Sequence, residues 1–426
     1  MSTNTTISNI SELDVYLVGG AVRDQLLNRA VKDHDYLVVG ASIKQMLTLG
    51  FKQVGKDFPV FLHPSTKEEY ALARTERKQG QGYTGFACYA EPDVTIEQDL
   101  LRRDLTVNAM AKSRAGEIID PYHGQQDLKN KVLRHVSDAF IEDPLRVLRV
   151  ARFAARYHSY GFTIALETLE LMTKISVSGE LSALSAERIW QEMQRSLAES
   201  HPEVFFQVLY QCQALKALWP ELSVLWGVPN PAQWHPEICS GDHTMMVLQQ
   251  AVLLTKDNKN KTAIRFAALC HDLGKGLTAS ENWPSHHGHE KAGLPLVEKI
   301  AKQLKIPTYY KQLALKVCEH HLHCHKAFQL KASTLLSIFN QLDVWRKPQE
   351  FDDFLIACKS DFVGRLGFEN RPYPQEQYLK DAMLAASNVN AKAFVEQGLQ
   401  GIAIKAAIAK ARLHAIKKVK AEYQIT

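Results

Sequence analysis

The chain has few of the features that mark secreted, membrane-spanning or low-complexity proteins. Its 426 residues include only seven cysteines, scattered and without a CxxC pair. That excludes a disulfide framework or a zinc ribbon and indicates reduced thiols. No run reaches the roughly 18 apolar residues of a membrane helix, and the start, MSTNTTISNISELD, lacks the basic and apolar regions of a secretory signal. We therefore expect a cytoplasmic protein that does not enter a membrane.

A large excess of one charge is also missing. Lys and Arg number 51 against 46 Asp and Glu, a formal charge of +5. Residues 402–426 contain six basic residues and one acidic one, which leaves 45 of each sign in the rest of the chain. The apolar residues of this terminal segment predict a basic amphipathic helix, whose lysines either bind RNA phosphates or are merely solvated.

The order of the expected elements separates an α/β beginning from a helical remainder. Short apolar runs predict strands over 14–18, 35–39 and 69–74, and a helix over 21–27. From about Asp138 apolar positions recur every three or four residues, which predicts helices throughout. Proline-containing breaks at 227–231 and 347–348 indicate boundaries. We therefore expect four parts, with these ranges: an α/β head (1–137), a helical neck (138–226), a third, helical domain (227–346) and a helical C-terminal part (347–426).

A glycine pair and two aspartates provide the first chemical signal. Gly19 and Gly20 follow an expected strand and precede a helix, where backbone amides can approach a phosphate that Arg23 also reaches. Asp33 and Asp35 are two residues apart on an expected strand, so both carboxylates leave the same face. Either half alone would fit a turn or solvated aspartates. Their joint order favours two-metal phosphoryl or nucleotidyl transfer.

An arginine-rich helix provides the second signal. Arg146, Arg149, Arg152 and Arg156 are spaced three, three and four residues apart, so they share one helical stripe, which Asp143 precedes. An aspartate and an arginine one turn later offer an acceptor and a donor. These match the amino group and ring nitrogen that cytosine and adenine share. The pattern predicts selection of C and A over U and G, with an ordinary amphipathic surface helix as the alternative.

The motifs LVGGAVRD, DHD, RRDLTVNAM and EDPLRVLRVARF occur in this order and resemble the class II tRNA nucleotidyltransferases, which comprise the CCA-adding enzymes and their bacterial poly(A) polymerase relatives. The resemblance implies a polymerase-β-like nucleotidyltransferase head in which Asp33 and Asp35 are catalytic and bind Mg²⁺. It also implies that Gly20 and Arg23 contact the triphosphate. The residues that it implies as a protein template for incoming CTP or ATP are Arg103, Asp143, Arg146, Arg149 and Arg152.

Histidine is concentrated in one part of the chain. Ten of the 17 histidines lie in the 91 residues from His235 to His325. Adjacent His271 and Asp272 offer an imidazole and a carboxylate to one cation, and His243 upstream with Asp361 downstream would complete a mixed site. Such a site with open positions suits water activation for phosphoester hydrolysis. The further candidate ligands are His289 and His321, whereas three more histidines could contact substrate or be exposed: His320, His323 and His325.

HDLGKG, with His243 upstream and Asp361 downstream, resembles the HD phosphohydrolase superfamily, which makes His271 and Asp272 catalytic. A class II head followed by an HD domain resembles the multifunctional CCA proteins of gammaproteobacterial type over nearly the whole chain. That resemblance implies addition of CCA to tRNA from CTP and ATP. It also implies 2′,3′-cyclic phosphodiesterase, 2′-nucleotidase and phosphatase activities that use nickel or another divalent transition metal. The segment HHLHCH has more histidines than such relatives carry, which leaves its metal ligands open.

Two other functions stay open. A bacterial poly(A) polymerase would share the head but extend RNA with A alone, and the HD domain argues against it because those polymerases typically lack one. An RNA-end phosphohydrolase could use the head only as an RNA-binding module. A monomer and a homodimer both fit the sequence.

Overall fold

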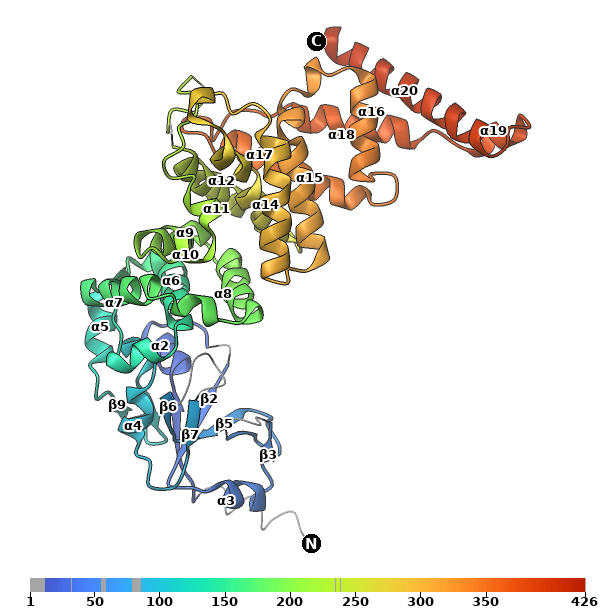
Figure 1. Ribbon diagram of the computed structural model, residues 1–426. Helices are drawn as coiled ribbons and strands as arrows, with labels where there is room; N and C mark the ends of the chain where they lie inside the picture. Colours follow the sequence, from blue (N-terminus) through green and yellow to red (C-terminus); the bar gives the residue numbers. More distant parts are fainter. Residues whose placement is uncertain are drawn as a thin grey trace. The chain divides into compact units, whose positions relative to one another are not determined.

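The computed structural model describes residues 12–31, 33–54, 59–78, 86–233, 235–237 and 239–425 (Figure 1). Two further segments also resemble the multifunctional CCA proteins, GYTGF (82–86) and WHPEI (234–238), and parts of both lie outside these residues. The chain divides into two compact units, Met1–Glu192 with Val204–Leu218 and Met193–Glu203 with Trp219–Thr426. The four domain ranges expected from the sequence stay predictions.

A mixed sheet forms the beginning of the first unit. Within the described residues it has seven strands in the order β3-β4-β5-β2-β1-β8-β9. β2 is parallel to β5 and antiparallel to β1, which is also antiparallel to β8. The strands are β1 (Asp14–Val18), β2 (Asp35–Val39), β3 (Lys52–Gln53), β4 (Val60–Leu62), β5 (Glu69–Leu72), β8 (Ala111–Ser113) and β9 (Ile118–Ile119), and a separate hairpin pairs β6 (Thr75–Lys78) with β7 (Phe86–Tyr89).

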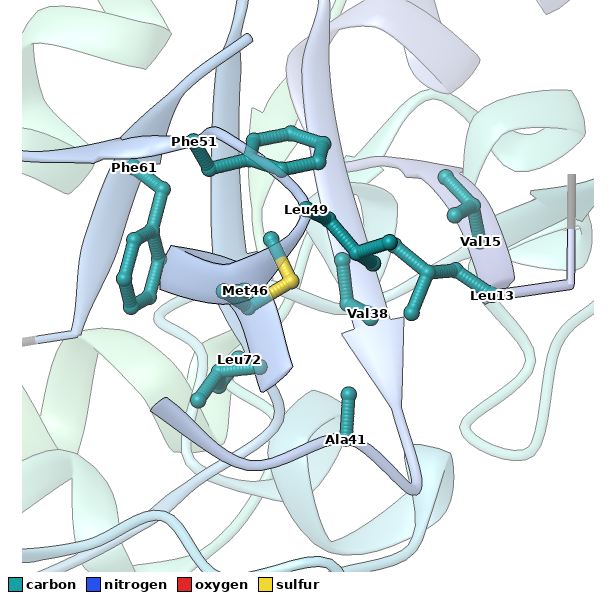
Figure 2. Packing of buried hydrophobic residues seen from close by; sticks show 9 residues of the cluster. All are labelled: Leu13, Val15, Val38, Ala41, Met46, Leu49, Phe51, Phe61 and Leu72. Carbon is teal, nitrogen blue, oxygen red and sulfur yellow. The ribbon is translucent and has the colours of Figure 1, made fainter. Parts of the chain in front are cut away.

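Alternate residues of the central strands enter two different cores. Val38 of β2 packs in one cluster with Met46, Phe51 and Phe61, which Figure 2 shows around the helix that carries Met46. The preceding residue, Leu37, belongs to a second cluster with residues of β1 and β8. Because successive side chains of a strand point to opposite faces, both faces of the sheet are covered. The DHD motif lies at the edge of the sheet where β2 begins.

Helices complete the first unit. They are α2 (Gly20–Leu26), α3 (Ile43–Thr48), α4 (Ile96–Leu101), α5 (Gly124–Asn130), α6 (Leu145–Tyr157), α7 (Leu166–Val177), α8 (Ala186–Ala198), α9 (Pro202–Gln211) and α10 (Ala214–Leu218), with short 3₁₀ turns η2 (Thr106–Asn108), η3 (Asp138–Glu142), η4 (His158–Tyr160) and η5 (Glu180–Ala183). One short strand interrupts the expected helical run: β11 (Thr163–Ile164) pairs in parallel with β10 (Val132–Leu133).

The second unit is helical throughout its described residues. Its elements are α11 (Pro220–Ser223), α12 (Ser240–Leu254), α13 (Lys261–Cys270), η6 (Leu273–Leu277), η7 (Ser280–Asn282), α14 (His289–Gln303), α15 (Thr308–His325), η8 (Ala327–Gln329), α16 (Ala332–Leu342), α17 (Pro348–Val363), α18 (Gln375–Ser387), α19 (Lys392–Glu396) and α20 (Ile402–Ile425). α13 packs against α12, α15 and α17, and α14 packs against α15 and η6. This packing brings histidine-bearing segments from distant parts of the sequence together.

Most of the expected elements are confirmed. The strands over 14–18 and 35–39 are present, the third spans Glu69–Leu72, and the basic C-terminal segment forms α20. The broad fold expectation, an α/β head followed by helical domains, is therefore correct. Among the described residues, no helix is long and apolar enough to span a membrane.

Candidate active sites

The turn between β1 and α2 is built from two glycines. Gly19 has a φ of +68°, a conformation that residues with a Cβ rarely adopt. A Cβ on Gly19 would lie 2.8 Å from Nη1 of Arg103, and one on Gly20 would lie 3.3 Å from Nη2 of Arg23. Two guanidinium groups therefore reach this turn, an arrangement that binding of a triphosphate here requires.

The two aspartates of the DHD motif lie at the start of the neighbouring strand. β2 begins at Asp35, so Asp33 lies just before the strand, and the expectation that one strand aligns both carboxylates is wrong. Both residues are exposed. Desolvation raises the pKa of Asp35, the Arg103 guanidinium lowers it and the Asp33 carboxylate raises it. The two carboxylates and Arg103 are thus close enough to interact.

Arg23 is held inside the first unit. Its side chain is buried, donates from Nε to Oδ1 of Asp24 at 3.0 Å and from Nη1 to Oδ1 of Asn108, and lies 5.1 Å from the ring centre of Tyr157. The hydroxyl of Tyr157 donates to the same Asp24 at 3.1 Å. These contacts fix the guanidinium beside Gly20 before any ligand binds, which is the pre-organisation that a phosphate contact needs.

Asp99 fixes the position of Arg103. The Asp99 side chain is fully buried and pairs with Nη2 of Arg102 at 2.7 Å and with Nη2 of Arg103 at 3.1 Å. Burial would raise the pKa of Asp99, but the two guanidinium groups outweigh it and lower that pKa. Asp99 therefore remains an anion that holds Arg103 between Gly19 and Asp35.

The arginines of α6 do not form the solvated stripe of a surface helix. Arg146 and Arg152 are buried. Arg146 donates to the carbonyl oxygens of Ala139 at 2.8 Å and Arg102 at 2.5 Å, and Arg152 pairs with Glu192 of α8. The arginine face of the helix is therefore buried at Arg146 and Arg152 and partly exposed at Arg149 and Arg156.

Arg149 pairs with Asp104, a residue of the RRDLTVNAM motif. Nη2 of Arg149 lies 2.7 Å from Oδ2 of Asp104, and the other carboxylate oxygen accepts from Nδ2 of Asn108 at 2.9 Å. Asn108 also accepts from Arg23. A continuous chain of polar contacts thus joins the triphosphate candidate Arg23 to the template candidate Arg149.

Asp143 and Arg146, which the sequence predicts to form an acceptor–donor edge for a base, both have partners inside the protein. Oδ2 of Asp143 accepts from Nη2 of Arg188 on α8 at 2.8 Å, and Oδ1 accepts from the backbone amide of Leu145 at 3.1 Å. Arg146 meets the two carbonyl oxygens instead, because its side chain points back over the preceding turn. To present the acceptor–donor edge predicted from sequence spacing to a base, Asp143 and Arg146 would therefore have to move or exchange these partners.

Five positioning residues of the first unit were missed from the sequence. A signal existed for two of them, since the RRDLTVNAM motif includes Asp104 and Asn108, but their partners lie far along the chain. The five residues are Asp99, Asp104, Asn108, Arg188 and Glu192.

In the second unit, five segments bring six expected ligands into one buried cluster. His243 comes from α12, His271 and Asp272 from the end of α13, and the others from the beginning of α14, from α15 and from α17. Two groups of possible ligand atoms each lie within 4.8 Å of one another. The first group is His243, His271 and Asp361, and the second is Asp272, His289 and His321.

Backbone carbonyls orient three of the imidazoles. Nδ1 of His271 lies 2.7 Å from the Ala268 oxygen, Nδ1 of His289 lies 2.7 Å from the His286 oxygen, and Nδ1 of His321 lies 3.1 Å from the Val317 oxygen. A carbonyl can only accept, so each Nδ1 carries the proton. In the neutral form of each ring, Nε2 then has a lone pair that a cation can bind in place of a proton, as in protein metal sites.

Unsatisfied atoms at the centre of the cluster fit a metal. Nε2 of His271 and Oδ1 of Asp272 are buried and have no well-aligned hydrogen-bond partner among the described residues. Oδ1 of Asp272 lies 3.2 Å from Nε2 of His289 and 3.6 Å from Nε2 of His321. Imidazole nitrogens with carboxylate oxygens suit a divalent transition metal, and a bound cation would satisfy these atoms.

The protonation states also suit a cation. Burial would raise the pKa of Asp272, but His271 and Lys275 hold it well below its usual range. Burial would likewise raise the pKa of Asp361, and His325 and His271 hold it well below. The cluster therefore contains two anionic carboxylates in a buried place, which a cation would compensate.

Three further residues touch the cluster, and two expected histidines do not. Nε2 of His325 lies 2.6 Å from Oδ2 of Asp361, and Nζ of Lys275 lies 2.6 Å from Oδ2 of Asp272. Glu237, just before α12, lies 3.0 Å from Nδ1 of His243. His320 and His323 instead line a small apolar cavity with Leu335 and Phe339. Lys275 lies in the HDLGKG motif and Glu237 in the segment WHPEI, but the sequence assigned neither residue a role.

Family models match three parts of the chain. The "Poly A polymerase head domain" matches residues 15–134, and the HD domain matches residues 241–349. A third, described as "Probable RNA and SrmB- binding site of polymerase A", matches residues 161–225. The order of the three agrees with an α/β head followed by two helical regions.

Curated relatives are similar over nearly the whole chain. The multifunctional CCA protein of Mannheimia succiniciproducens is 57% identical over 411 residues, 96% of this chain and 98% of the relative. That of Pseudoalteromonas atlantica is 59% identical over 404 residues, 95% of this chain and 99% of the relative.

Solved structures share the fold at low identity. A CCA-adding enzyme in complex with ATP has a TM-score of 0.64 at 18% identity, covering 98% of this chain and 90% of the other. The Thermotoga maritima CCA-adding enzyme complexed with tRNA has a TM-score of 0.63 at 18% identity, with coverages of 98% and 93%.

Proposed function

Because the chain belongs to the family of multifunctional CCA proteins, we propose that it adds and repairs the 3′-terminal CCA of tRNA from CTP and ATP, and that its HD domain hydrolyses phosphoesters. The observation that carries the first activity is the close approach of Arg103 and Arg23 to the glycine turn, with the charges of Arg103 and Asp33 acting on Asp35. Both activities belong to one enzyme, and its free cysteines suit a reducing compartment such as the cytoplasm.

Nucleotide addition forms a bond between the tRNA 3′-oxygen and the α-phosphorus of CTP or ATP and breaks the bond to the leaving pyrophosphate. Asp33 and Asp35 would hold Mg²⁺, whose charge lowers the energy of the attacking and leaving oxygens. Arg23 and Arg103, fixed by Asn108 and Asp99, bind the triphosphate at Gly20. Their fixed positions orient the α-phosphate for attack in line with the leaving group.

For base selection we propose Asp143 with Arg146, Arg149 and Arg152. Each of these side chains has an acceptor or donor inside the protein, so a nucleobase shares or replaces those partners. Arg188 holds the Asp143 carboxylate and Glu192 holds Arg152. These two residues of α8 therefore position the base-selecting groups.

For the HD domain we propose 2′,3′-cyclic phosphodiesterase, 2′-nucleotidase and phosphatase activities. His243, His271, Asp272 and Asp361 would hold nickel or another divalent transition metal, with His289 and His321 as further ligands. Such a metal lowers the pKa of bound water for attack on phosphorus. The protein's own part is to orient the imidazoles through their Nδ1 bonds and to keep both carboxylates ionised.

Two substitutions test whether the activities have separate sites. Asp35→Ala should abolish incorporation of labelled CTP into a tRNA that lacks its terminus, and it should leave hydrolysis of a 2′,3′-cyclic phosphate unchanged. His271→Ala should do the reverse. Loss of both activities in either variant, with the fold intact by circular dichroism, would refute two independent sites.

Product length distinguishes the proposal from its alternatives. With CTP and ATP together, the enzyme should extend the tRNA by CCA and stop. A long A tract made from ATP alone would indicate a poly(A) polymerase. Hydrolysis without any CTP incorporation would indicate a phosphohydrolase whose head only binds RNA.

A further inference from the structure

Glu237 lies in the short segment that precedes α12, and its side chain is buried although it is charged. Only 5% of the side chain is exposed, and Oε1 lies 3.0 Å from Nδ1 of His243 and 2.8 Å from Nδ1 of His235. The other oxygen, Oε2, accepts from the backbone amide of Leu366 at 3.3 Å. Both carboxylate oxygens are thus committed to groups that surround the HD cluster.

His243 lies between two carboxylates. Its Nε2 is 3.1 Å from Oδ1 of Asp361 and faces the candidate cation position, and its Nδ1 faces Glu237. In His271, His289 and His321, Nδ1 faces a backbone carbonyl, and in His325 it faces the hydroxyl of Tyr373. His243 therefore depends on a side chain, and not on its own helix, for its ring orientation and tautomer.

We propose that Glu237 is the positioning residue of the HD metal site: it keeps the proton of His243 on Nδ1, so that Nε2 presents a lone pair to the metal. This inference rests on the proposed metal-dependent function of the HD domain. A carboxylate on the far side of an imidazole also makes the ring a stronger donor to a cation.

The bond to Leu366 gives Glu237 a second task. Leu366 follows the end of α17, the helix that carries Asp361, so one glutamate joins the segment before α12 to the segment after α17. His243 and Asp361 are 118 residues apart in the sequence. Glu237 therefore holds the two helices that supply these ligands in register.

The same three residues, His235, Glu237 and His243, could be considered a separate cation site, since their ligand atoms also lie within 4.8 Å. A cation on Nδ1 of His243 would require the proton to move to Nε2. Nε2 would then be unable to bind the metal beside Asp361 and His271. The two sites compete for one ring. Nδ1 of His243 lies close to Glu237 but lacks a well-aligned hydrogen bond among the described residues. Two further buried atoms without such a bond, Nε2 of His271 and Oδ1 of Asp272, lie in the HD cluster, whereas Nδ1 of His235 already has Glu237 as its partner, so these atoms favour a cation in the HD cluster.

Glu237→Ala and Glu237→Gln test the proposal in the full-length chain. Ni²⁺ is titrated into metal-free protein by calorimetry, with Mg²⁺ in excess to occupy the head. The dissociation constant for Ni²⁺ should rise roughly 10- to 100-fold in Glu237→Ala, the range found for such residues. It should rise less in Glu237→Gln, whose amide oxygen still accepts from Nδ1. Glu281→Gln, the same change at an exposed position of the same unit, is the control and should bind as the unaltered chain does.

Activity gives the second readout. Hydrolysis of a 2′,3′-cyclic nucleotide should need more Ni²⁺ in both Glu237 variants, with kcat largely restored in Glu237→Gln at saturating Ni²⁺ and CCA addition unchanged. Unchanged or stronger Ni²⁺ binding in both variants would overturn the role of Glu237. If the unaltered chain binds Ni²⁺ but does not hydrolyse the substrate, only the proposed hydrolysis is refuted. If Glu237→Ala unfolds, Glu237→Gln still decides, because it preserves the shape of the side chain and keeps an oxygen that accepts from Nδ1 of His243, while it removes the charge and the acceptor for the Leu366 amide.

Discussion

Gly19 and Gly40 both have positive φ values, +68° and +71°, but their surroundings differ. A Cβ on Gly19 would lie 2.8 Å from the Arg103 guanidinium, whereas no described atom lies within 4 Å of one on Gly40. A residue with a side chain would therefore strain the backbone at both positions. Only Gly19 adds a conflict with a residue of the proposed triphosphate site.

Gly19→Ala should lose far more activity than Gly40→Ala. A side chain in a left-handed conformation costs about 1–2 kcal/mol of stability, and the cost at Gly19 should be higher because its ψ of −127° lies outside that region; thermal unfolding measures both. Gly19→Ala should also displace Arg103 and slow CTP incorporation roughly 100-fold, the effect expected of a displacement near 1 Å. Equal incorporation rates in the two variants would contradict the close approach of Arg103 to Gly19.

Asp104 makes the head sensitive to acid. Burial would raise its pKa, but Arg149 and Asn108 hold it well below its usual range. A carboxyl with a lowered folded pKa stabilises the protein above the unfolded pKa of about 3.9, and that stability is lost as the pH falls below it. Asp104→Asn should cost roughly 1.5–3 kcal/mol at pH 7.

When the pH falls from 7 to 3, Asp104→Asn should lose less stability than the unaltered chain. Melting temperatures at the two pH values measure this difference. Asp257→Asn, at an exposed position, should keep the full pH dependence. Parallel curves for Asp104→Asn and the unaltered chain would show that the pair with Arg149 does not contribute.

Whole elements bring the HD ligands together, and two glycines permit the closest approach. A Cβ on Gly274 of η6 would lie 1.9 Å from the backbone oxygen of His289, and one on Gly293 of α14 would lie 2.5 Å from Sγ of Cys318. η6 and α14 therefore pack backbone against backbone. This contact places His289 against Asp272. Gly274 of HDLGKG therefore serves helix packing and does not form a phosphate-binding loop.

Gly274→Ala should push α14 away and remove His289 from the cluster. We expect loss of hydrolysis and weaker Ni²⁺ binding, with CCA addition unchanged, because the head lies in the other unit. Gly276→Ala is the matched control, since its Cβ would meet the side chain of Val224, which is exposed and able to move. Equal hydrolysis by both variants would contradict the backbone contact.

Among the described residues of each compact unit lies a proposed metal site with carboxylates, and the neighbours of the two sites differ. Exposed oxygens of Asp33 and Asp35 dominate the first, and buried imidazoles surround Asp272 and Asp361 in the second. Oxygen ligands suit Mg²⁺, whereas imidazole nitrogens suit transition metals. One chain is thus equipped to use two kinds of cation.

Removal of metals should separate the two activities. After treatment with EDTA and dialysis, both CCA addition and cyclic phosphate hydrolysis should be lost. Mg²⁺ alone should restore the addition, and Ni²⁺ should be required for the hydrolysis. Recovery of both activities with Mg²⁺ alone would contradict a transition-metal preference of the histidine cluster.

Local patterns were sufficient for much of this protein. The strand of residues 35–39, the helical texture after Asp138 and the pairing of His271 with Asp272 were predictable, because periodicity and adjacency involve neighbours along the chain. The same information misplaced Asp33 on a strand and could not identify the partner of Asp143 within the protein. In the structure Arg188, 45 residues away, takes Asp143, and no spacing rule identifies a partner at that distance.

The sequence by itself determined the classes of residue at both sites, their order and the α/β-then-helical architecture, since these follow from local composition and periodicity. Only the tertiary structure decided which acceptor each arginine meets, that His325 joins the cluster while His320 and His323 do not, and that Glu237 orients His243. The physical reason is that hydrogen bonds and ligand sets depend on atoms a few ångströms apart, and packing of α12, α13, α15 and α17 brings together residues as distant as His243 and Asp361.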